Sequence, residues 1–237
     1  MNDKVTALVL KITDYKENDL ILEVISKDKS FLSLVAKGAK KIDSKKHYYP
    51  LCLYEFIIDY KDHKNIFLIH NSKLLETYFD DNDLKLLSYK NIIVEATLKA
   101  KELYELKMYD SLIFTLKNMN IDNMYLLGCL YFGYLLKING ISPNVDGCVV
   151  CGNTSVVSIS NRLGGFVCLK HLNGLDSLDV EKLRKFRLIN KADFNYYEVL
   201  KDIEYDLEDF KIIINFYETN MDIILKAYKL FCDLFKD

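Results

Sequence analysis

The sequence of 237 residues contains no tryptophan, only two prolines and nine glycines, and no long hydrophobic run. Its longest apolar stretch, Tyr125 to Leu136, includes two glycines and stops at Lys137, which is too short to span a membrane. The polar N-terminus, residues 1–4, lacks the apolar core of a signal peptide. We therefore expect a cytoplasmic protein with no membrane partner.

Arginine is also scarce, and the positive charge is unevenly distributed along the chain. The net charge is only −2, and all three arginines lie beyond residue 160. Residues 27–46, by contrast, carry seven lysines against two aspartates. The chain as a whole is therefore no general polyanion binder, but this one segment is strongly basic.

The six cysteines do not form the pattern of a disulfide framework. Cys52, Cys129 and Cys232 are isolated in apolar surroundings, and a reducing cytoplasm keeps such residues as thiols. We expect these three side chains to pack in the core, as free cysteines commonly do.

The other three cysteines predict a zinc site. Cys148-x2-Cys151 is followed after sixteen residues by Cys168-x2-His171, the spacing of a zinc ribbon. Three sulfurs and one imidazole nitrogen complete a closed tetrahedral set, so we expect one structural Zn²⁺. Strands at Val156–Ser160 and Phe166–Cys168 would pair as a hairpin and bring the two halves of the site together.

Two other interpretations of the four residues are a chance spacing and a catalytic zinc. A catalytic zinc keeps one coordination position open for water. Zinc deaminases also place a glutamate proton shuttle beside their ligands, and no glutamate is close in sequence to any of these four. The pattern therefore favours a structural metal.

Residues 4–70 predict a small β-barrel. Short runs rich in Val, Ile, Leu, Phe and Tyr alternate with polar turns, and the last two runs form a hairpin through Lys61–Lys64. Five short antiparallel strands in about seventy residues indicate a barrel of the OB type. The predicted strands are Ala7–Ile12, Leu20–Ile25, Ser30–Lys37, Leu51–Tyr60 and Asn65–His70.

From Ser72 onward the apolar spacing becomes helical. The fold class is therefore α+β, with an N-terminal five-stranded OB-type barrel and a C-terminal all-helical domain that carries an inserted zinc ribbon. The predicted domains are 1–71 for the barrel, 72–143 and 176–237 for the helical domain, and 144–175 for the ribbon. The predicted helices follow an apolar pattern from Leu84 to Leu106, then Asp110–Asn118, Asn123–Lys137, Asp179–Leu188, Leu207–Phe216 and Met221–Phe235.

Most lysines of the basic segment lie in the longest connection of the barrel, between the third and fourth strands. Lysines along such a loop can follow a phosphate backbone without reading its sequence. The alternative is a solvated charged loop with no ligand. Tyr48, Tyr49 and Tyr54 could stack on bases, although aromatic residues in strands more often belong to the core. The DNA-binding candidates are Lys37, Lys40, Lys41, Lys45 and Lys46.

Motifs of enzymes are missing from the sequence. It contains no phosphate-binding glycine loop, no dinucleotide-binding G-x-G-x-x-G, no nucleophile elbow and no H-E-x-x-H. His47, His63 and His70 have no recognisable catalytic partner in sequence, and we assign no catalytic residue.

Several motifs together resemble the RecO family of bacterial repair and recombination mediators. Thr13–Asp19 is similar to the family's D-Y-x-E-x-D turn, and Ala36–Lys41 is similar to its A-K-G-A-[RK]-[RK] segment. Gly140–Pro143 resembles the G-x-x-P before the family's ribbon, and the ribbon motifs follow at 148–152 and 164–168. The resemblance extends from residue 4 to about residue 175. His171 stands where many relatives have cysteine, and the basic loop contains lysine only.

The resemblance implies a nucleoid-associated protein that is no enzyme. Members of this family bind single- and double-stranded DNA and anneal complementary strands. With a RecR-type partner they help to load the RecA recombinase onto strands coated by single-stranded DNA-binding protein (SSB). The family's helical body also receives the acidic C-terminal tail of SSB.

Two other functions are compatible with the sequence. The first is a zinc-ribbon scaffold for assembly that binds little DNA itself. The second is a metal-dependent nuclease, although the four-ligand site has no open coordination position.

Overall fold

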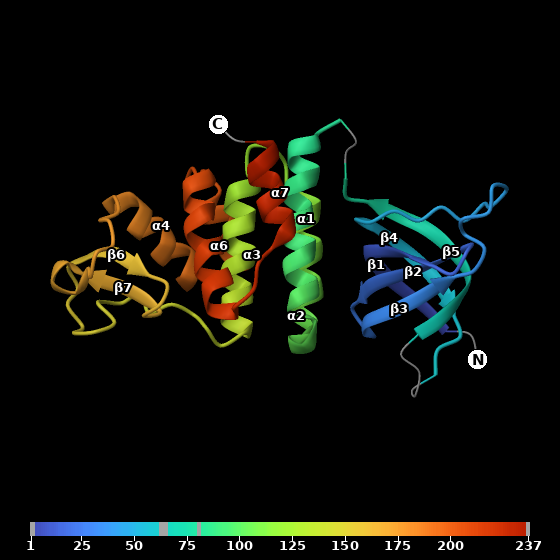
Figure 1. The fold of residues 1–237 in the computed structure, drawn as a ribbon, viewed down its shortest axis with the longest axis horizontal. Helices are drawn as coiled ribbons and strands as arrows, with labels where there is room; N and C mark the ends of the chain where they lie inside the picture. Colours follow the sequence, from blue (N-terminus) through green and yellow to red (C-terminus); the bar gives the residue numbers. More distant parts are fainter. Residues whose placement is uncertain (1–2, 62–65, 80–81, 236–237) are drawn as a thin grey trace. The chain divides into compact units, whose positions relative to one another are not determined.

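The computed structural model describes residues 3–61, 66–79 and 82–235 (Figure 1). The chain divides into two compact units, Met1–Lys117 and Asn118–Asp237. Among the described residues, no helix combines the length and apolar character needed to cross a membrane.

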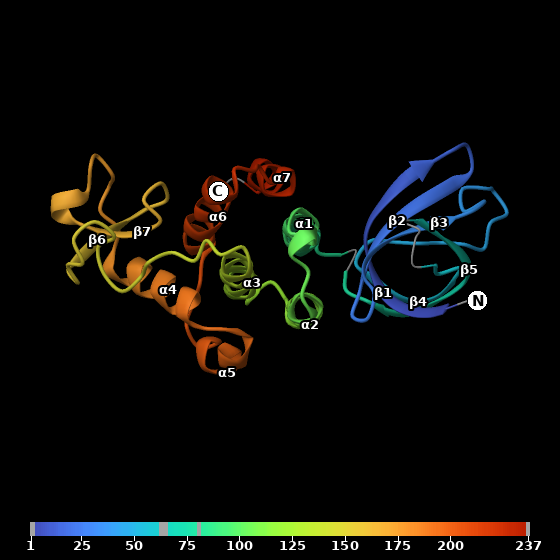
Figure 2. The same ribbon diagram turned by 90° about the horizontal axis from the view of Figure 1, so that it is seen from below.

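The first unit begins with a closed five-stranded barrel, seen nearly end-on in Figure 2. Its strand order is β1-β2-β3-β5-β4, and only the β3–β5 pairing is parallel. This arrangement confirms the predicted OB-type barrel. The strands are β1 (Asp3–Tyr15), β2 (Asp19–Ser26), β3 (Ser30–Ala36), β4 (Cys52–Ile58) and β5 (Ile66–Thr77).

Alternation of side chains explains the barrel core. Along β4, Cys52, Tyr54, Phe56 and Ile58 are buried, and the residues between them are half-buried. The strand ends are less predictable, because pairing with neighbours extends β1 and β5 into polar sequence. β5, for example, continues seven residues beyond His70 to Thr77. Residues 62–64 of the predicted hairpin loop lie outside the described residues.

Helices α1 (Leu84–Lys99) and α2 (Leu106–Asn118) complete the first unit, joined by the short η1 (Lys101–Leu103). Asp83 caps α1 by accepting a hydrogen bond from Leu86 N at 2.8 Å. The buried ammonium of Lys90 donates to the carbonyl of Tyr78 at 2.7 Å, which holds α1 against the chain leaving the barrel. The apolar pattern predicted from Leu84 to Leu106 was wrong beyond Lys99, because the helix breaks there and Leu106 is exposed.

The second unit is built on three packed helices, α3 (Met124–Ile138), α4 (Val180–Lys191) and α6 (Leu207–Met221). A hairpin of β6 (Val156–Ser160) and β7 (Gly165–Cys168) lies in the chain between α3 and α4, as predicted. The remaining elements are η2 (Leu169–His171), η3 (Phe194–Tyr196), α5 (Tyr197–Leu200) and α7 (Lys226–Leu234).

The break between the last two helices lies further along the chain than predicted. α6 continues to Met221 and ends at Asp222, which adopts a left-handed conformation with φ of 51°. The next turn is held by Glu218, whose carboxylate accepts a hydrogen bond from Leu225 N at 2.6 Å. α7 therefore begins at Lys226 and not at Met221.

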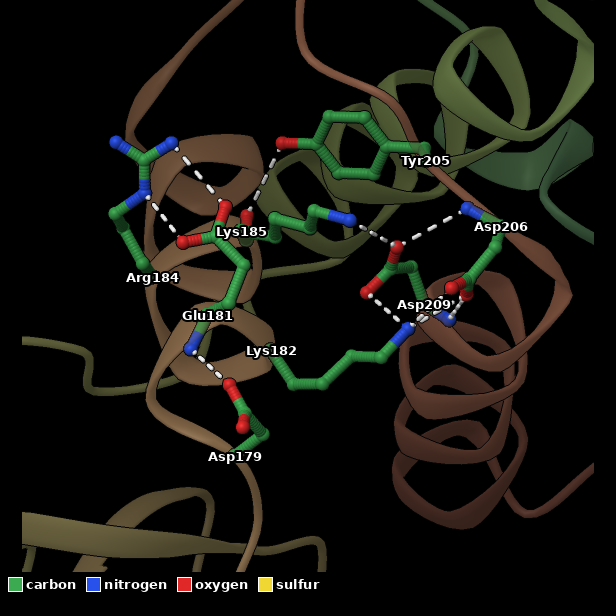
Figure 3. A network of polar contacts seen from close by, with 8 residues as sticks. All are labelled: Asp179, Glu181, Lys182, Arg184, Lys185, Tyr205, Asp206 and Asp209. Atoms are coloured by element: carbon green, nitrogen blue, oxygen red, sulfur yellow. Dashed lines mark hydrogen bonds and ion pairs between the residues drawn. The ribbon is translucent and has the colours of Figure 1, made fainter.

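A polar network joins α4 to the start of α6 (Figure 3). Asp206 and Asp209 form a capping box, in which each side chain accepts a hydrogen bond from the other's backbone N–H. The buried carboxylate of Asp209 also forms ion pairs with Lys182 and Lys185, both at 3.0 Å. The contact between Asp209 Oδ1 and Lys182 is an ion pair without hydrogen-bond alignment.

The substitution Asp209→Ala tests the contribution of this network to folding. Because it leaves two lysines without their buried partner, we expect it to lower the free energy of unfolding by about 3–5 kcal/mol. Glu208→Ala is the matched control, since the neighbouring carboxylate is exposed and forms a surface ion pair with Lys211. That variant should lose less than about 1 kcal/mol. Urea denaturation measures both, and equal losses would contradict this account.

Candidate functional site

The structure brings the four predicted metal ligands together in one cluster. The sulfurs of Cys148, Cys151 and Cys168 and a ring nitrogen of His171 all lie within 4.8 Å of one another. Cys148 and Cys168 are buried, Cys151 is exposed and His171 is half-buried. Such a cluster could hold a metal ion.

The spacing of the ligand atoms fits zinc. Bonds of zinc to sulfur and nitrogen in a tetrahedron put two sulfurs about 3.8 Å apart and a sulfur and a nitrogen about 3.6 Å apart. Cys151 Sγ lies 3.7 Å from Cys168 Sγ. His171 Nδ1 lies 3.5 Å from Cys148 Sγ and 3.4 Å from Cys168 Sγ. A disulfide would require sulfurs about 2 Å apart, so the cysteines are thiols.

The backbone favours the thiolate form of Cys148. Burial raises the pKa of this thiol, but hydrogen bonds from the backbone at Cys168, Val150 and Cys151 lower it to about 6. For Cys151, the backbone at Asn153 lowers the pKa, while burial and the neighbouring sulfurs outweigh this effect and raise it. Two thiolates side by side repel each other, and a bound cation would relieve that repulsion.

Glycines shape the turns that carry the ligands. Gly152 has φ of +74°, and its N–H donates to the carbonyl of Cys148 at 2.8 Å, which closes the first pair. Gly165, with φ of +154°, forms a parallel bridge with Asn144. A Cβ at Gly165 would lie 2.3 Å from Asn144 O, so only glycine fits there.

The ribbon is fixed to helix α4 by apolar and polar contacts. The ring of Phe166 packs 6.0 Å from that of Phe186, and the Arg187 guanidinium lies over the Phe166 ring. Arg187 also donates to the carbonyl of Val145 at 2.6 Å. One small buried cluster of the ribbon includes two of the candidate metal ligands, with Val149, Val156 and Leu172 partly buried against it; its members are Cys148, Val167 and Cys168.

The lysine loop, residues 37–46, is the second candidate site. Lys37, Lys40, Lys41 and Lys45 are exposed, and Lys46 is half-buried. Lys40 forms an ion pair with Asp14 at 2.6 Å, and Lys46 donates to the carbonyl of Lys37 at 2.9 Å. Within the described part of the chain, the ammonium groups of Lys37, Lys41 and Lys45 form no ion pair.

The turn between β1 and β2 supports this loop, a role that the sequence did not reveal. Asp19 accepts a hydrogen bond from Gly38 N at 2.8 Å, and Lys40 N donates to the carbonyl of Asn18 at 3.0 Å. With the Lys40–Asp14 pair, three contacts connect two segments that are adjacent only in the folded barrel. The acidic residues of the turn at 13–19 are the sequence feature from which contacts with the lysine loop could have been predicted.

The three candidate stacking tyrosines differ in exposure. Tyr48 and Tyr54 are buried in the barrel core and cannot stack on bases, and burial raises the pKa of both. Tyr49 is 51% exposed and is the remaining candidate. His47 and His70 are exposed, as expected, and His63 lies outside the described residues.

The isolated cysteines largely match expectation. Cys52 and Cys129 are buried, which confirms the predicted core packing. Cys232 is only half-buried, so the prediction was wrong in part there. It lies on α7, which presents little buried surface beyond Phe231.

Comparison with known proteins identifies relatives of this chain. Residues 1–78 match a family model described as "Recombination protein O N terminal". The DNA repair protein RecO of Bacillus cereus (strain AH187) is 27% identical over 180 residues, and that of Bacillus cytotoxicus is 29% identical over 189 residues. Each match covers 72% of this chain and 71% of the relative.

Metal analysis tests the cluster. We expect purified protein to contain one zinc per chain, and Cys148→Ser or Cys168→Ser to lose it, because three ligands hold zinc poorly. Elemental analysis by mass spectrometry gives the metal content. Cys232→Ser is the control and should retain zinc. Zinc-free wild-type protein, or full zinc in either ligand variant, would contradict the interpretation.

Gly165→Ala tests the backbone that positions the ligands. The added Cβ would collide with Asn144, so we expect a loss of about 2–4 kcal/mol in the free energy of unfolding and weaker zinc binding. Gly164→Ala is the control, because a Cβ there meets nothing within 4 Å and the cost is limited to about 1–2 kcal/mol of left-handed strain. Chemical denaturation compares the two, and equal losses would show that the close approach to Asn144 is unimportant.

Proposed function

The chain belongs to the RecO family, and from this membership we propose that it is a non-catalytic mediator of DNA repair and recombination. In this proposal it binds single- and double-stranded DNA without reading sequence and anneals complementary strands. The RecO names of its relatives support the repair and recombination role. The finer activities rest on the lysine loop.

The single observation that supports DNA binding most strongly is the supply of free positive charge on this loop. Lys37, Lys41 and Lys45 are exposed, and their ammonium groups form no ion pair with the described chain. A lysine ammonium is a compact charge that binds phosphate without the planar geometry of arginine. Binding through these groups is independent of base sequence.

Annealing follows from the same electrostatics. Two complementary strands repel each other through their phosphates, and lysines that neutralise part of this charge allow the strands to approach. Contacts to the backbone leave the base edges free to pair. In this proposal the loop supplies the positive charge that reduces the repulsion between the two strands.

The family also provides the proposed partners. We propose that a RecR-type protein acts with this chain to load RecA onto SSB-coated strands, and that the helical domain binds the C-terminal tail of SSB. The prediction of three domains, with boundaries at 71, 143 and 175, is part of this proposal.

We assign a structural role to the zinc. All four protein ligands of a tetrahedral site are present in the cluster, so a bound ion would keep no position for a substrate. Zinc would hold together a ribbon whose own apolar cluster is small. The lysine loop, and not the metal, is then the functional surface.

Charge reversal in the loop tests DNA binding. The triple substitution Lys37→Glu, Lys40→Glu and Lys41→Glu should abolish annealing and weaken DNA binding strongly, with zinc retained. For wild-type protein, the logarithm of the binding constant for a single strand should fall with the logarithm of salt concentration with a slope of about −2 to −3.5. Fluorescence anisotropy at several salt concentrations measures this slope, and a strand-pairing assay measures annealing.

The matched control changes total charge equally at exposed lysines outside the loop: Lys107→Glu, Lys201→Glu and Lys229→Glu. Annealing should survive in this control. Equal loss in both triple variants would indicate a general charge effect. DNA binding by wild-type protein that is absent or insensitive to salt would favour the scaffold alternative.

A further inference from the structure

A small hollow lies beside the lysine loop in the first unit. Its volume is about 260 Å³, and it occurs where the loop returns to the barrel and helix α1 begins. The hollow is lined by Tyr49, Pro50, Leu51, Phe79, Leu87 and Asn91.

The walls of this hollow are mainly apolar and aromatic. The ring centroids of Tyr49 and Phe79 are 6.4 Å apart at an interplanar angle of 56°, so the two rings form adjoining walls. Tyr49 is half exposed, which leaves part of its ring open to a ligand. The lining also includes the exposed amide of Asn91, which can both donate and accept hydrogen bonds.

The backbone beneath Tyr49 is held in place by buried groups. The hydroxyl of Tyr54 accepts a hydrogen bond from Tyr49 N at 3.2 Å and donates to the carbonyl of His47 at 3.3 Å. Leu51 is buried with a left-handed φ of 60°, and its N–H and carbonyl bond to Val9 and Tyr78. A bulky residue in this conformation is strained, and such strain is typical of functional sites.

The position of the hollow relates it to the phosphate-binding lysines. Tyr49 follows Lys46 by three residues, so their Cα atoms are at most about 11 Å apart. A ligand that fills the hollow and touches the loop must therefore combine a flat, largely apolar group with a nearby negative charge. Free phosphate does not fit, because the lining offers no positive side chain.

We propose that the hollow holds one unpaired base of a DNA strand whose phosphates the lysine loop neutralises. This inference rests on the proposed function and names the part of the ligand that the loop does not bind. An unpaired base has π faces for Tyr49 and Phe79 and polar edges for Asn91. A base inside a duplex is stacked on both faces and cannot enter.

The hollow would give the barrel a preference for single strands that the lysines alone cannot provide. Phosphate contacts are available on single and double strands alike, whereas a base contact requires an unstacked base. When complementary strands pair, the base leaves the hollow and only the salt-sensitive contacts remain. The annealed product is then bound more weakly than the separate strands.

Anisotropy measurements with three ligands test this inference: a single-stranded oligonucleotide, a strand of the same length whose bases are removed, and a duplex. Tyr49→Ala should weaken single-strand binding by about 5- to 150-fold, the range for loss of one stacked base, and leave binding of the other two ligands unchanged. Tyr49→Phe should retain full binding. Tyr49→Leu, which fills the same space without a π face, should lose part of it.

Tyr196→Ala is the matched control, because Tyr196 is similarly exposed and lies in the second unit. The lysine triple variant should lose affinity for all three ligands. If that variant loses binding but Tyr49→Ala and Tyr49→Leu do not, the base site is wrong and the proposed function stands. Equal weakening for intact and base-free strands would also overturn the base site. If neither the lysine variant nor salt affects DNA binding, the proposed function itself fails.

Discussion

The closure of the barrel by a parallel β3–β5 pairing is the constraint on which the lysine loop and the adjoining hollow depend. Among the described residues, this pairing joins Ser33 to Ile66, Leu34 to Phe67 and Val35 to Leu68. Because β5 lies between β3 and β4 in the sheet, consecutive strands β3 and β4 cannot be joined by a tight hairpin turn. Their connection must cross one end of the barrel, and its length makes room for five lysines. Closure therefore produces both the long loop and the place where it returns, at Tyr49 to Leu51.

The second unit meets a different constraint, because its ribbon is too small to fold on hydrophobic burial alone. Two of the three buried residues in the cluster around Val167 are candidate zinc ligands, and a domain of this size needs an additional source of stability. Zinc can supply it, since metal binding free energy becomes folding free energy in such ribbons. Helix α4 contributes the rest through Phe186 and Arg187. The metal cluster thus serves the folding of the second unit, whereas the lysine loop is the proposed binding surface of the first unit.

The sequence predicted features that depend on local spacing and failed where distant segments decide the outcome. The four ligands and the β6–β7 hairpin were predictable because two short motifs and a glycine turn define them. The end of α1 and the start of α7 were not, since the apolar pattern continues across both breaks. Tyr48 and Tyr49 are adjacent, yet one is buried and the other is exposed. Outside a regular strand no alternation rule distinguishes them. The contact of Asp19 with Gly38 is likewise set by strand pairing and not by either motif.

The proposed DNA binding is compatible with a net negative chain, because the charges are distributed unequally and many of the carboxylates are engaged in ion pairs. In the second unit, Asp206 and Asp209 are engaged by Lys182 and Lys185, so these carboxylates add little repulsion at a distance. Exposed charges further than about 10 Å from the DNA are screened at ordinary ionic strength, which makes the local excess on the loop decisive. That excess is itself moderated, because Asp14 neutralises Lys40. A loop with moderate charge releases its strands more readily than a fully basic one. Annealing requires this release, because a mediator that held both strands tightly would prevent its product from leaving.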